Sequence, residues 1–473
     1  MMRFSFQDAV KISGGRAVVL PIGDAPICGF TWDSRTVTKD CAFIAMPGER
    51  VDGNDFAIRA VQAGARLVLG TRQPDAKVRA ILAELGAGHI VIQDGPSCLR
   101  AFAAVQRMEL HDTIVVGITG SCGKTTSKDM VAAVLATQLR TVATQGNRNN
   151  ELGVPATVLD ASEDTQALVV EMGMRGLGQI RDMCSFVKPR IGLITNVGVS
   201  HMELLGSREN IARAKGELIE ALPLSGSCAI LPAQDEYSIF ILDCYDPNRE
   251  RDLLLYGFSD DSDVRGTGLT LDQLGCASFT LELPDGTSAP VHLNIPGQHN
   301  ASNALGAAAV GYRLGVSIEN IVKGLESVQA PSMRMQVQRR SDGLTIINDA
   351  YNANPDSMRA ALRSLVSMDC SGKRIAILGD MGELGDDALQ FHRQVGEYIA
   401  SLPVDALYCL GELAACIAAG ARDAGMDAAL IHGCADKPGI LEALRESLQP
   451  DDIVLVKASR SMGMEEIVKG LMD

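Results

Sequence analysis

The sequence lacks an excess of positive charge. Among its 473 residues, Lys and Arg number 43 against 58 Asp and Glu, which gives a formal net charge of −15. A protein with this charge repels both nucleic acid and anionic membrane surfaces through its overall field. We therefore expect no nucleic-acid partner and no membrane partner, although a basic site confined to one small phosphate ligand is compatible with the charge.

The sequence also lacks cysteine pairs with metal-ligand spacing, and it has no long uncharged apolar run. Its 12 cysteines are scattered along the chain, as is usual for the reduced thiols of cytosolic proteins. The first ten residues include Asp8 where a signal peptide would be apolar, and no segment has the length and apolarity of a membrane span. These absences predict a soluble, cytoplasmic protein without structural disulfides.

The chain is long enough for two to four domains. In its last third, short apolar runs alternate with helix-length amphipathic segments, and this alternation predicts parallel strands joined by helices in a doubly wound fold. The runs occupy residues 344–347, 374–378, 406–410, 428–431 and 453–456. Because Pro331 ends the preceding helical segment, we place a linker at residues 329–332 and the C-terminal domain at residues 331–473.

The segments before that linker predict a central α/β domain over residues 109–330. Its strands are expected at 115–119, 167–170 and 191–195, each followed by a loop and a helix. Glycines and short alternating runs between residues 253 and 296 favour a small antiparallel insertion. Residues 1–108 mix short strands with one helix at 57–63, which predicts a small α/β domain. The predicted fold class is therefore α/β, with three domains.

Residues 117–126, GITGSCGKTT, lie between an apolar segment and a helical one. In a phosphate-binding loop of this kind, backbone N–H groups converge on phosphate oxygens, a lysine adds positive charge and a Thr hydroxyl binds Mg²⁺. The strict eight-residue pattern fails because Ile118 stands where its first glycine belongs. The shorter pattern predicts a nucleoside triphosphate site, with a glycine-rich turn as the alternative. Its residues are Gly120, Ser121, Cys122, Gly123, Lys124, Thr125 and Thr126.

Three further residues are candidates for the chemistry around a bound nucleotide. Glu171 follows the strand at 167–170, where an acid can reach Mg²⁺ beside a triphosphate; a solvated loop carboxylate is the alternative. His201 lies in the loop after the next strand, at the same sheet edge, and is either a metal ligand or a structural histidine. Lys215 lies in an amphipathic helix at 212–221, where a position on a solvated helix face is the alternative.

Two amide-rich segments add candidate binding residues. Residues 146–155, GNRNNELGVP, concentrate asparagines and glycines before a helix. Their amide side chains can hydrogen-bond to phosphate oxygens or to a peptide carboxylate. The alternative is that the segment is a surface turn without a binding role. Residues 296–300, PGQHN, open a helix of small residues, in which Asn300 has the donor and the acceptor that pair with an adenine edge.

Together and in this order, the motifs resemble those of the Mur ligases, ATP-dependent enzymes that form amide bonds in bacterial cell-wall synthesis. The resemblance extends over nearly the whole chain. It rests on TGSCGKTT at 119–126, GNRNNELGVP, EMG at 171–173, TNVGVSHMELLG at 195–206 and AKGEL at 214–218. Residues 33–56 are also similar to the UDP-substrate-binding N-terminal domain of this family.

Three C-terminal motifs narrow the resemblance within the family. They are NDAYNANPDSM at 348–358, GDMGELG at 379–385 and VLVKASRS at 454–461. All are similar to the member that adds D-alanyl-D-alanine to UDP-N-acetylmuramoyl-tripeptide. The resemblance implies that the Rossmann-like C-terminal domain binds this dipeptide. The member that adds the third residue and the folate-polyglutamylating relative carry different residues after the equivalent of Asp349.

The resemblance implies ATP and Mg²⁺ as cofactors and gives the candidate residues their roles. The implied catalytic residues are Lys124, His201 and Lys215. The implied Mg²⁺ ligands are Thr125, Glu171, His201 and Lys215, the last as a carbamate, in which an anionic oxygen replaces the ammonium. Besides the phosphate loop, the residues implied to bind ATP are Asn300, Arg334 and Asp349. The implied substrate-binding residues are Ser34, Arg35, Asp52, Asn147, Asn149, Asn150, Asn352 and Asn354.

An amide does not form readily from a carboxylate at neutral pH. The implied reaction therefore passes through an acyl phosphate and ADP before the dipeptide amine displaces phosphate, and preorganised charges stabilise both steps. Two alternatives stay open: a sibling ligase that uses a single amino acid, and a nucleotide switch or motor, which would be expected to lack His201 and Lys215. The sequence leaves open whether the third residue of the tripeptide is meso-diaminopimelate or lysine. We expect a monomer.

Overall fold

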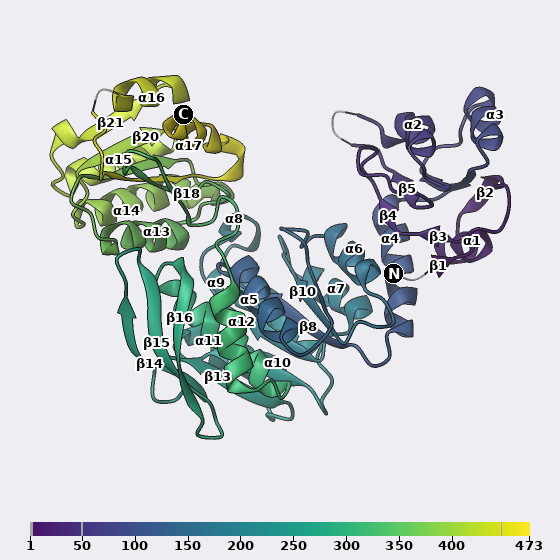
Figure 1. Ribbon diagram of the computed structural model, residues 1–473, viewed down its shortest axis with the longest axis horizontal. Coiled ribbons are helices and arrows are strands. Elements are labelled where there is room, and N and C mark those ends of the chain that lie inside the picture. Colours follow the sequence, from purple (N-terminus) through teal and green to yellow (C-terminus); the bar gives the residue numbers. More distant parts are fainter. Residues whose placement is uncertain (1–2, 49–50, 446) are drawn as a thin grey trace. The chain divides into compact units, whose positions relative to one another are not determined.

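Most of the chain folds into parallel strands that alternate with helices, as Figure 1 shows for the computed structural model. The structure describes residues 3–48, 51–445 and 447–473, so residues 49 and 50 of the predicted UDP-substrate segment at 33–56 lie outside the described residues. The chain divides into two compact units. The first comprises Met1–Gly117, Leu139–Gly173 and Ile180–Arg190, and the second comprises Ile118–Gln138, Met174–Gln179 and Ile191–Asp473.

The first unit contains a five-stranded sheet in the order β2-β7-β6-β5-β4. Its strands are β2 (Arg16–Val19), β4 (Phe30–Thr31), β5 (Ala42–Ala45), β6 (Leu67–Gly70) and β7 (Gly88–Val91). All neighbours are parallel except β2 and β7. Strands β5 and β6 are buried along their whole length, which accounts for their unbroken apolar sequences.

Helices complete this part of the first unit. They are α1 (Phe6–Ser13), the 3₁₀ helix η1 (Gly53–Phe56), α2 (Ala57–Gln62), α3 (Ala76–Glu84) and α4 (Gly95–Glu109). Side chains at the N-cap positions Ser5, Asp75 and Asp94 accept hydrogen bonds from backbone N–H groups of α1, α3 and α4. The helix predicted at 57–63 is therefore confirmed, and this region has the expected mixture of short strands and helices.

The first unit also contains a parallel pair of strands that delivers Glu171. Strand β10 (Ala167–Glu171) pairs with β9 (Thr141–Ala143), and every residue of β10 is buried. Helices α6 (Gly153–Asp160) and α7 (Gln179–Val187) accompany these strands. Strand β8 (Ile114–Thr119) begins in the first unit and ends in the second.

In the second unit, strand β8 leads through a loop into helix α5 (Lys124–Ala136). Strands β11 (Ile191–Ile194), β12 (Cys228–Pro232) and β13 (Asp252–Gly257) are parallel neighbours. The helices that accompany them are α8 (Met202–Leu205), α9 (Arg208–Glu220), α10 (Glu236–Tyr245), α11 (His299–Arg313) and α12 (Ile318–Ser327). This arrangement is the strand, loop and helix alternation that the sequence predicts.

The antiparallel segment is shorter than the sequence suggests. Residues 253–257 belong to β13, which pairs in parallel with both β12 and β14 (Val264–Leu271). Within residues 253–296, only β14, β15 (Cys276–Glu282) and β16 (Ser288–Pro296) are antiparallel neighbours. The run Leu253 to Leu255 is apolar because it continues the parallel sheet, a pairing that the local pattern does not specify.

The end of the second unit is a doubly wound sheet in the order β17-β18-β22-β19-β20-β21, parallel except for β17. Its strands are β17 (Gln336–Arg339), β18 (Thr345–Asp349), β19 (Arg374–Gly379), β20 (Ala406–Leu410), β21 (Ile431–Cys434) and β22 (Ile453–Lys457). Two core clusters flank it. Helices α13 (Pro355–Ser367), α14 (Ala388–Ala400) and α15 (Ala414–Asp423) pack into one, and α16 (Lys437–Arg445) and α17 (Glu465–Met472) into the other (Figure 1).

Four of the five predicted C-terminal strands lie at the expected residues, but the strand predicted at 428–431 is displaced. Residues 428–430 form the 3₁₀ helix η3 (Ala428–Leu430), because the Asp427 side chain accepts a hydrogen bond from Ala429 N, and β21 begins only at Ile431. Among the described residues, no helix is long and apolar enough to cross a bilayer.

Candidate active site

The predicted phosphate loop joins β8 to α5 in the conformation that its glycines permit. Gly120 and Gly123 have φ angles of +153° and +79°, which L-residues with side chains rarely adopt. Lys124, the first residue of α5, turns back over the loop, where its Nζ donates to Gly120 O at 2.7 Å. The loop thus has the glycine turn and the lysine expected of a phosphate site.

The loop that follows β11 holds the phosphate loop in shape. Thr195 Oγ1 donates to Cys122 O at 2.5 Å, and Cys122 N donates to Asn196 Oδ1 at 2.9 Å. Gly198 N also donates to Ser121 Oγ at 2.8 Å. The sequence predicts that polar residues after β11 lie near the nucleotide, but it does not reveal that they bind the backbone of the phosphate loop.

Helix α11 contributes two buried amides beside the same loop. Asn303 Oδ1 accepts from Ser127 Oγ at 3.2 Å, and Asn303 Nδ2 donates to Asn300 Oδ1 at 3.0 Å. Asn300 Nδ2 donates to Pro296 O at 2.8 Å. Asn300, which the sequence predicts to bind the nucleotide, is therefore hydrogen-bonded to a second buried amide, that of Asn303. Asn303 was missed, although its spacing of three residues from Asn300 places both on one helix face.

Lys215 is buried in the middle of α9, with only 1% of its surface exposed. This burial excludes the alternative of a solvated helix face. Desolvation, and then the positive charge of Lys124, hold the pKa of the Lys215 amine far below its usual value. The second unit therefore contains a buried lysine with a strong tendency to be neutral, close enough to Lys124 to feel its charge.

His201 lies just before α8 in a left-handed conformation, with a φ of +64°. Its Nδ1 is 2.8 Å from Glu383 Oε2, and Glu383, which also has a positive φ of +61°, is 3.4 Å from Arg175. The contact with His201 holds the pKa of the Glu383 carboxyl below its usual value. The sequence identified the GDMGELG segment only by resemblance, and gave Glu383 no role.

In the first unit, Glu171 is 1% exposed and accepts a hydrogen bond from Asn149 Nδ2 at 2.7 Å. This burial excludes the alternative of a solvated loop carboxylate. Asn149 O also accepts from Gly173 N at 2.8 Å, which ties the amide-rich segment to the end of β10. Asn150 Oδ1 accepts from Gly153 N at 3.0 Å at the start of α6, and Asn147 is exposed. The structure thus brings together Asn149 and Glu171 of the predicted set.

The C-terminal candidates lie around a buried ion pair. Asp349 Oδ2 is 2.6 Å from Lys457 Nζ, and Asp349 Oδ1 accepts from Met335 N at 3.0 Å. Lys457 Nζ also donates to Asn352 O at 2.8 Å. Arg334 places its guanidinium 4.0 Å from the ring centre of Tyr351. Lys457 was missed as a site residue, because only the pairing of β18 with β22 brings it beside Asp349.

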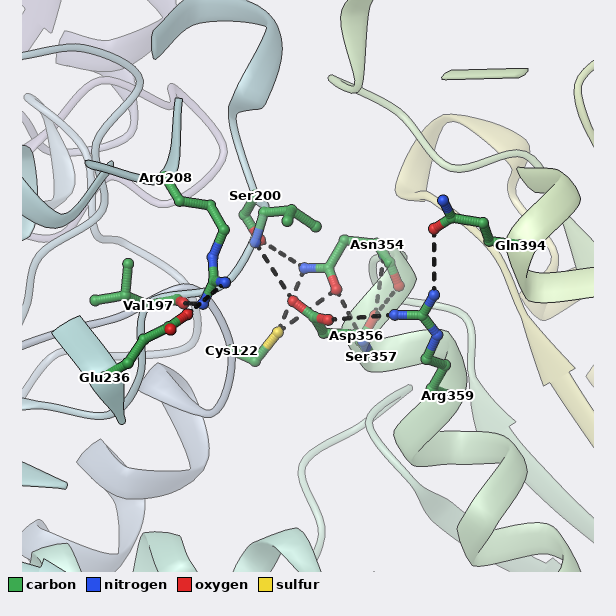
Figure 2. A network of polar contacts seen from close by, with 11 residues as sticks. Cys122, Val197, Ser200, Arg208, Glu236, Asn354, Asp356, Ser357, Arg359 and Gln394 are labelled. Atoms are coloured by element: carbon green, nitrogen blue, oxygen red, sulfur yellow. Dashed lines mark hydrogen bonds and ion pairs between the residues drawn. The ribbon is translucent and has the colours of Figure 1, made fainter. Parts of the chain in front are cut away.

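Asn354 at the start of α13 lies against the phosphate loop, as Figure 2 shows. Its Nδ2 donates to Ser200 Oγ at 2.6 Å and lies 3.4 Å from Cys122 Sγ. Its Oδ1 accepts from Ser357 N at 2.8 Å. Asn354, predicted to bind substrate, is 8% exposed and has both ends of its amide engaged within the protein.

The candidates for the UDP end occupy separate loops of the first unit. Arg35 Nη2 is 2.7 Å from Asp33 Oδ2, and this interaction lowers the pKa of the Asp33 carboxyl to about 2. Asp52 Oδ1 accepts from Asn54 N at 2.9 Å, and Asp52 Oδ2 is 3.3 Å from Arg72. Ser34, next to Arg35, is partly buried. Asp33 and Arg72 are the charged neighbours that the sequence did not single out.

The implied Mg²⁺ ligands are chemically mixed. Among residues 3–48, 51–445 and 447–473, no three His, Cys, Asp or Glu side chains form a group able to hold a metal ion. The proposed ligands include a hydroxyl, at Thr125, and a lysine that supplies oxygen only after carbamylation. Carboxylate, hydroxyl and carbamate oxygens are the hard donors that Mg²⁺ prefers, so Thr125, Glu171 and carbamylated Lys215 fit the metal. The imidazole nitrogens of His201 are not donors of this kind, and its Nδ1 lies 2.8 Å from Glu383 Oε2.

Comparison with protein families gives three matches that follow one another along the chain. Residues 26–107 match the Mur ligase family, catalytic domain; residues 118–311 match the Mur ligase middle domain; and residues 333–460 match the Mur ligase, glutamate ligase domain. Curated relatives match over nearly their full length. The UDP-N-acetylmuramoyl-tripeptide--D-alanyl-D-alanine ligase of Bacillus subtilis (strain 168) is 38% identical over 94% of this chain and 93% of its own.

The chain belongs to the Mur ligase family. The Escherichia coli (strain K12) enzyme with the same name as the Bacillus subtilis relative is 32% identical over 95% of each chain.

Solved structures confirm the fold class, α/β with the three-domain Mur ligase architecture. A crystal structure of MurF from Acinetobacter baumannii has a TM-score of 0.87 and 30% identity, and covers 100% of this chain and 99% of its own. MurF ligase from Thermotoga maritima in complex with ADP has a TM-score of 0.78 and 26% identity, and covers 94% of this chain and 97% of its own. The match to the Acinetobacter baumannii structure extends over the whole chain.

Proposed function

We propose that the protein is an ATP-dependent ligase that joins D-alanyl-D-alanine to UDP-N-acetylmuramoyl-tripeptide and releases ADP and phosphate. The observation that carries the proposal is the match, over 93% of its length, to a relative named for this reaction. The motifs at 348–358, 379–385 and 454–461 belong to the same C-terminal sheet region, which supports the dipeptide as acceptor. The product is a precursor of the bacterial cell wall.

The reaction proceeds in two chemical steps. A carboxylate oxygen of the tripeptide attacks the γ-phosphorus of ATP, the bond to the bridging oxygen breaks, and ADP leaves. The neutral amine of the dipeptide then attacks the acyl carbon, an amide forms, and phosphate leaves while the amine proton passes to a base or to water. Lys124 and the phosphate-loop amides bind the transferred phosphoryl oxygens and stabilise their developing charge.

Mg²⁺, when bound, neutralises phosphate charge and orients the β- and γ-phosphates. The side chains assigned to hold it are Thr125, Glu171, His201 and Lys215 as a carbamate. Asn149 orients the Glu171 carboxylate through its hydrogen bond of 2.7 Å. Support for the carbamate comes from the burial of Lys215, because only a neutral amine adds to CO₂, with release of a proton.

We assign the remaining candidate residues to parts of ATP and of the two substrates. Asn300 is assigned to the adenine, Arg334 to phosphate and Asp349 to ribose. For the amide-rich segment we retain Asn147 and Asn150 beside Asn149, and for the dipeptide we retain Asn352. Ser34, Arg35 and Asp52 are assigned to the UDP end, where the exposed guanidinium of Arg35 offers charge to a diphosphate.

We also propose the organisation of the whole protein. Residues 1–108 bind the UDP substrate, residues 109–330 bind ATP, and residues 331–473 bind the dipeptide. The enzyme acts as a monomer in the cytoplasm, the compartment that its scattered thiols favour. Closure of the domains excludes water from the acyl phosphate, which would otherwise hydrolyse.

A direct assay tests the proposed function. Purified protein is incubated with ATP, Mg²⁺ and UDP-N-acetylmuramoyl-tripeptide, and phosphate release is measured with and without D-alanyl-D-alanine. Release that requires the dipeptide, with the matching increase in product mass, is the expected result. Phosphate release that requires a single amino acid would indicate a sibling ligase of the same family. Release that needs no acceptor would indicate a nucleotide switch. Omission of Mg²⁺ should abolish release.

A further inference from the structure

The first turn of α13 makes two polar contacts with the loop that follows β11. Asn354, the N-cap residue of α13, donates from Nδ2 to Ser200 Oγ at 2.6 Å. Two residues later, Asp356 Oδ2 accepts from Val199 N at 3.3 Å. Figure 2 shows both side chains turned toward this loop. Residues separated by more than 150 positions are thus joined by neighbouring hydrogen bonds.

The same loop holds the phosphate loop. Ser200 Oγ lies 3.5 Å from Ser121 O, and Gly198 N donates to Ser121 Oγ at 2.8 Å. Asn354 also reaches the phosphate loop directly, with Cys122 Sγ 3.4 Å from its Nδ2. The start of α13 therefore contacts both the phosphate loop and the loop that supports it.

The amide of Asn354 performs two separable tasks. Its Oδ1 accepts from Ser357 N at 2.8 Å, and Ser357 Oγ accepts from Asn354 N at 2.9 Å, so the residue caps α13. Its Nδ2 is left to make the contacts with Ser200 and Cys122. A capping residue needs only an acceptor, and Ser or Asp would cap equally well; an amide is required for the second task.

We infer that Asn354 is a positioning residue that docks the C-terminal domain on the phosphate loop through Ser200. The inference rests on the proposed function, in which that domain delivers the amine of a dipeptide to an acyl phosphate formed at the phosphate loop. Contact between α13 and Ser200 then fixes how closely the amine approaches. Asn354 acts through this contact and does not bind the dipeptide itself.

The contact should affect amine transfer more than nucleotide binding. The backbone of Cys122 is already held by Thr195 and Asn196, at 2.5 Å and 2.9 Å, without any contribution from α13. Loss of the Asn354 amide leaves those two bonds in place. The affinity for ADP should therefore be retained while use of the acceptor declines.

The test compares Ser200→Ala, Asn354→Ala and the double variant in the full-length protein. Ser200→Ala leaves the cap of α13 intact, so it reports on docking even if Asn354→Ala folds poorly. We expect kcat/KM for D-alanyl-D-alanine to fall about tenfold in each single variant, because the hydrogen bond between Asn354 and Ser200 is lost. The double variant should lose clearly less than the product of the two single losses, because both substitutions remove the contact between Asn354 and Ser200, although each also removes a contact of its own, with Cys122 Sγ and with Ser121 O. The dissociation constant for ADP, measured by calorimetry, should stay within about twofold of the wild type.

Asp75→Ala is the matched control for loss of a helix cap. Asp75 Oδ1 caps α3 through Val78 N at 2.8 Å, in a helix that belongs to the first unit. This variant should lose thermal stability as Asn354→Ala does but keep kcat/KM for the dipeptide. Unchanged acceptor kinetics in Ser200→Ala, additive losses in the double variant, or a parallel loss of ADP affinity would each overturn the inference. If the wild type shows no dipeptide-dependent phosphate release, the proposed function fails instead.

Discussion

Burial changes the chemistry available to Lys215. An exposed lysine is an ammonium at neutral pH, and an ammonium cannot add to CO₂. Lys215 is 1% exposed, and its burial disfavours the charged ammonium form. The positive charge of Lys124 disfavours a positive charge on Lys215 as well, so the pKa of Lys215 is far below its usual value. This environment favours the neutral amine from which the proposed carbamate forms.

Substitution of Lys215 by Ala tests the carbamate. The variant should lose about 100-fold or more in kcat, since an anionic ligand beside the phosphates is removed. Formate or acetate should partly restore activity by supplying the missing carboxylate. Lys128→Ala provides the control, because Lys128 is also buried, at 3% exposed, but should show no rescue. A fully active Lys215→Ala variant, or one that carboxylic acids do not restore, would remove the carbamate role.

At the scale of single residues, the sequence predicts those site residues that lie in recognisable motifs. The glycines and Lys124 of the phosphate loop follow from their spacing, and Glu171 follows from its place at the end of a buried strand. Glu383 and Lys457 could not be predicted in the same way. Their partners, His201 and Asp349, are more than 100 residues away, and only the folded chain brings each pair together.

The phosphate loop depends on glycine at one position for two independent reasons. Gly120 has a φ of +153°, and a Cβ atom at this position would overlap the hydroxyl group of Thr195. Thr195 in turn holds Cys122 O. A side chain at position 120 would thus both strain the turn and displace the residue that fixes the next part of the loop.

Gly120→Ala should therefore weaken nucleotide binding. We expect the dissociation constant for ADP to rise about tenfold or more, as measured by calorimetry, with little change in the far-ultraviolet circular dichroism spectrum. Gly286→Ala is the matched control, because Gly286 also has a positive φ, of +84°, but has open space around its Cβ position. Equal ADP affinity in the two variants would show that the overlap with Thr195 does not matter.

Strands β18 and β22 are joined at their ends by a buried ion pair. Asp349 and Lys457 are register partners in these parallel strands, and Lys457 is 2% exposed. Removing one member of such a pair leaves a buried charge without compensation, which costs more than the pair itself contributes. The pair therefore constrains substitution at either position.

Lys457→Met should lower the free energy of unfolding by about 3 kcal/mol, measured by urea denaturation. The double variant Lys457→Met, Asp349→Asn should recover part of this loss, because no buried charge is then left unpaired. Arg393→Met, which breaks the exposed pair between Arg393 and Asp423, should change stability little. If the double variant is less stable than Lys457→Met, the ion pair is not the cause.

At the scale of elements, the order of strands and helices is largely predictable from apolar runs, whereas their pairing is not. The strands at 374–378, 406–410 and 453–456 are found as predicted. Chain order does not reveal that β22 lies between β18 and β19. The shift of β21 comes from one side chain, Asp427, whose hydrogen bond to Ala429 N favours a turn over an extended strand.

The molecule as a whole carries buried histidines in both units. In the first unit, His89 is 2% exposed, and desolvation lowers its pKa to about 4. In the second unit, His392 is fully buried and its Nε2 accepts from Met381 N at 2.9 Å; burial lowers its pKa as well. Both side chains are neutral in the folded protein, whereas in the unfolded chain they bind protons near pH 6.5.

Linkage gives the sign of the resulting pH dependence. Above about pH 6.5 neither state binds a proton at His89, so pH has no effect there. As the pH falls from 6.5 toward 4, only the unfolded chain is protonated, and the folded state loses relative stability. For His89 alone the loss should reach about 2 kcal/mol between pH 7 and pH 5.

The single tryptophan, Trp32, lies in the first unit. Trp32 and His89 both belong to that unit, so urea unfolding followed by tryptophan fluorescence reports on the unit that contains His89. We expect the unfolding free energy from this signal to fall between pH 7 and pH 5 in the wild type and in His392→Gln, but to be nearly constant in His89→Met. The pH dependence should disappear in His89→Met because the methionine side chain cannot bind the proton that His89 takes up in the unfolded chain. An unchanged slope in His89→Met would assign the acid sensitivity of this unit to its carboxylates instead.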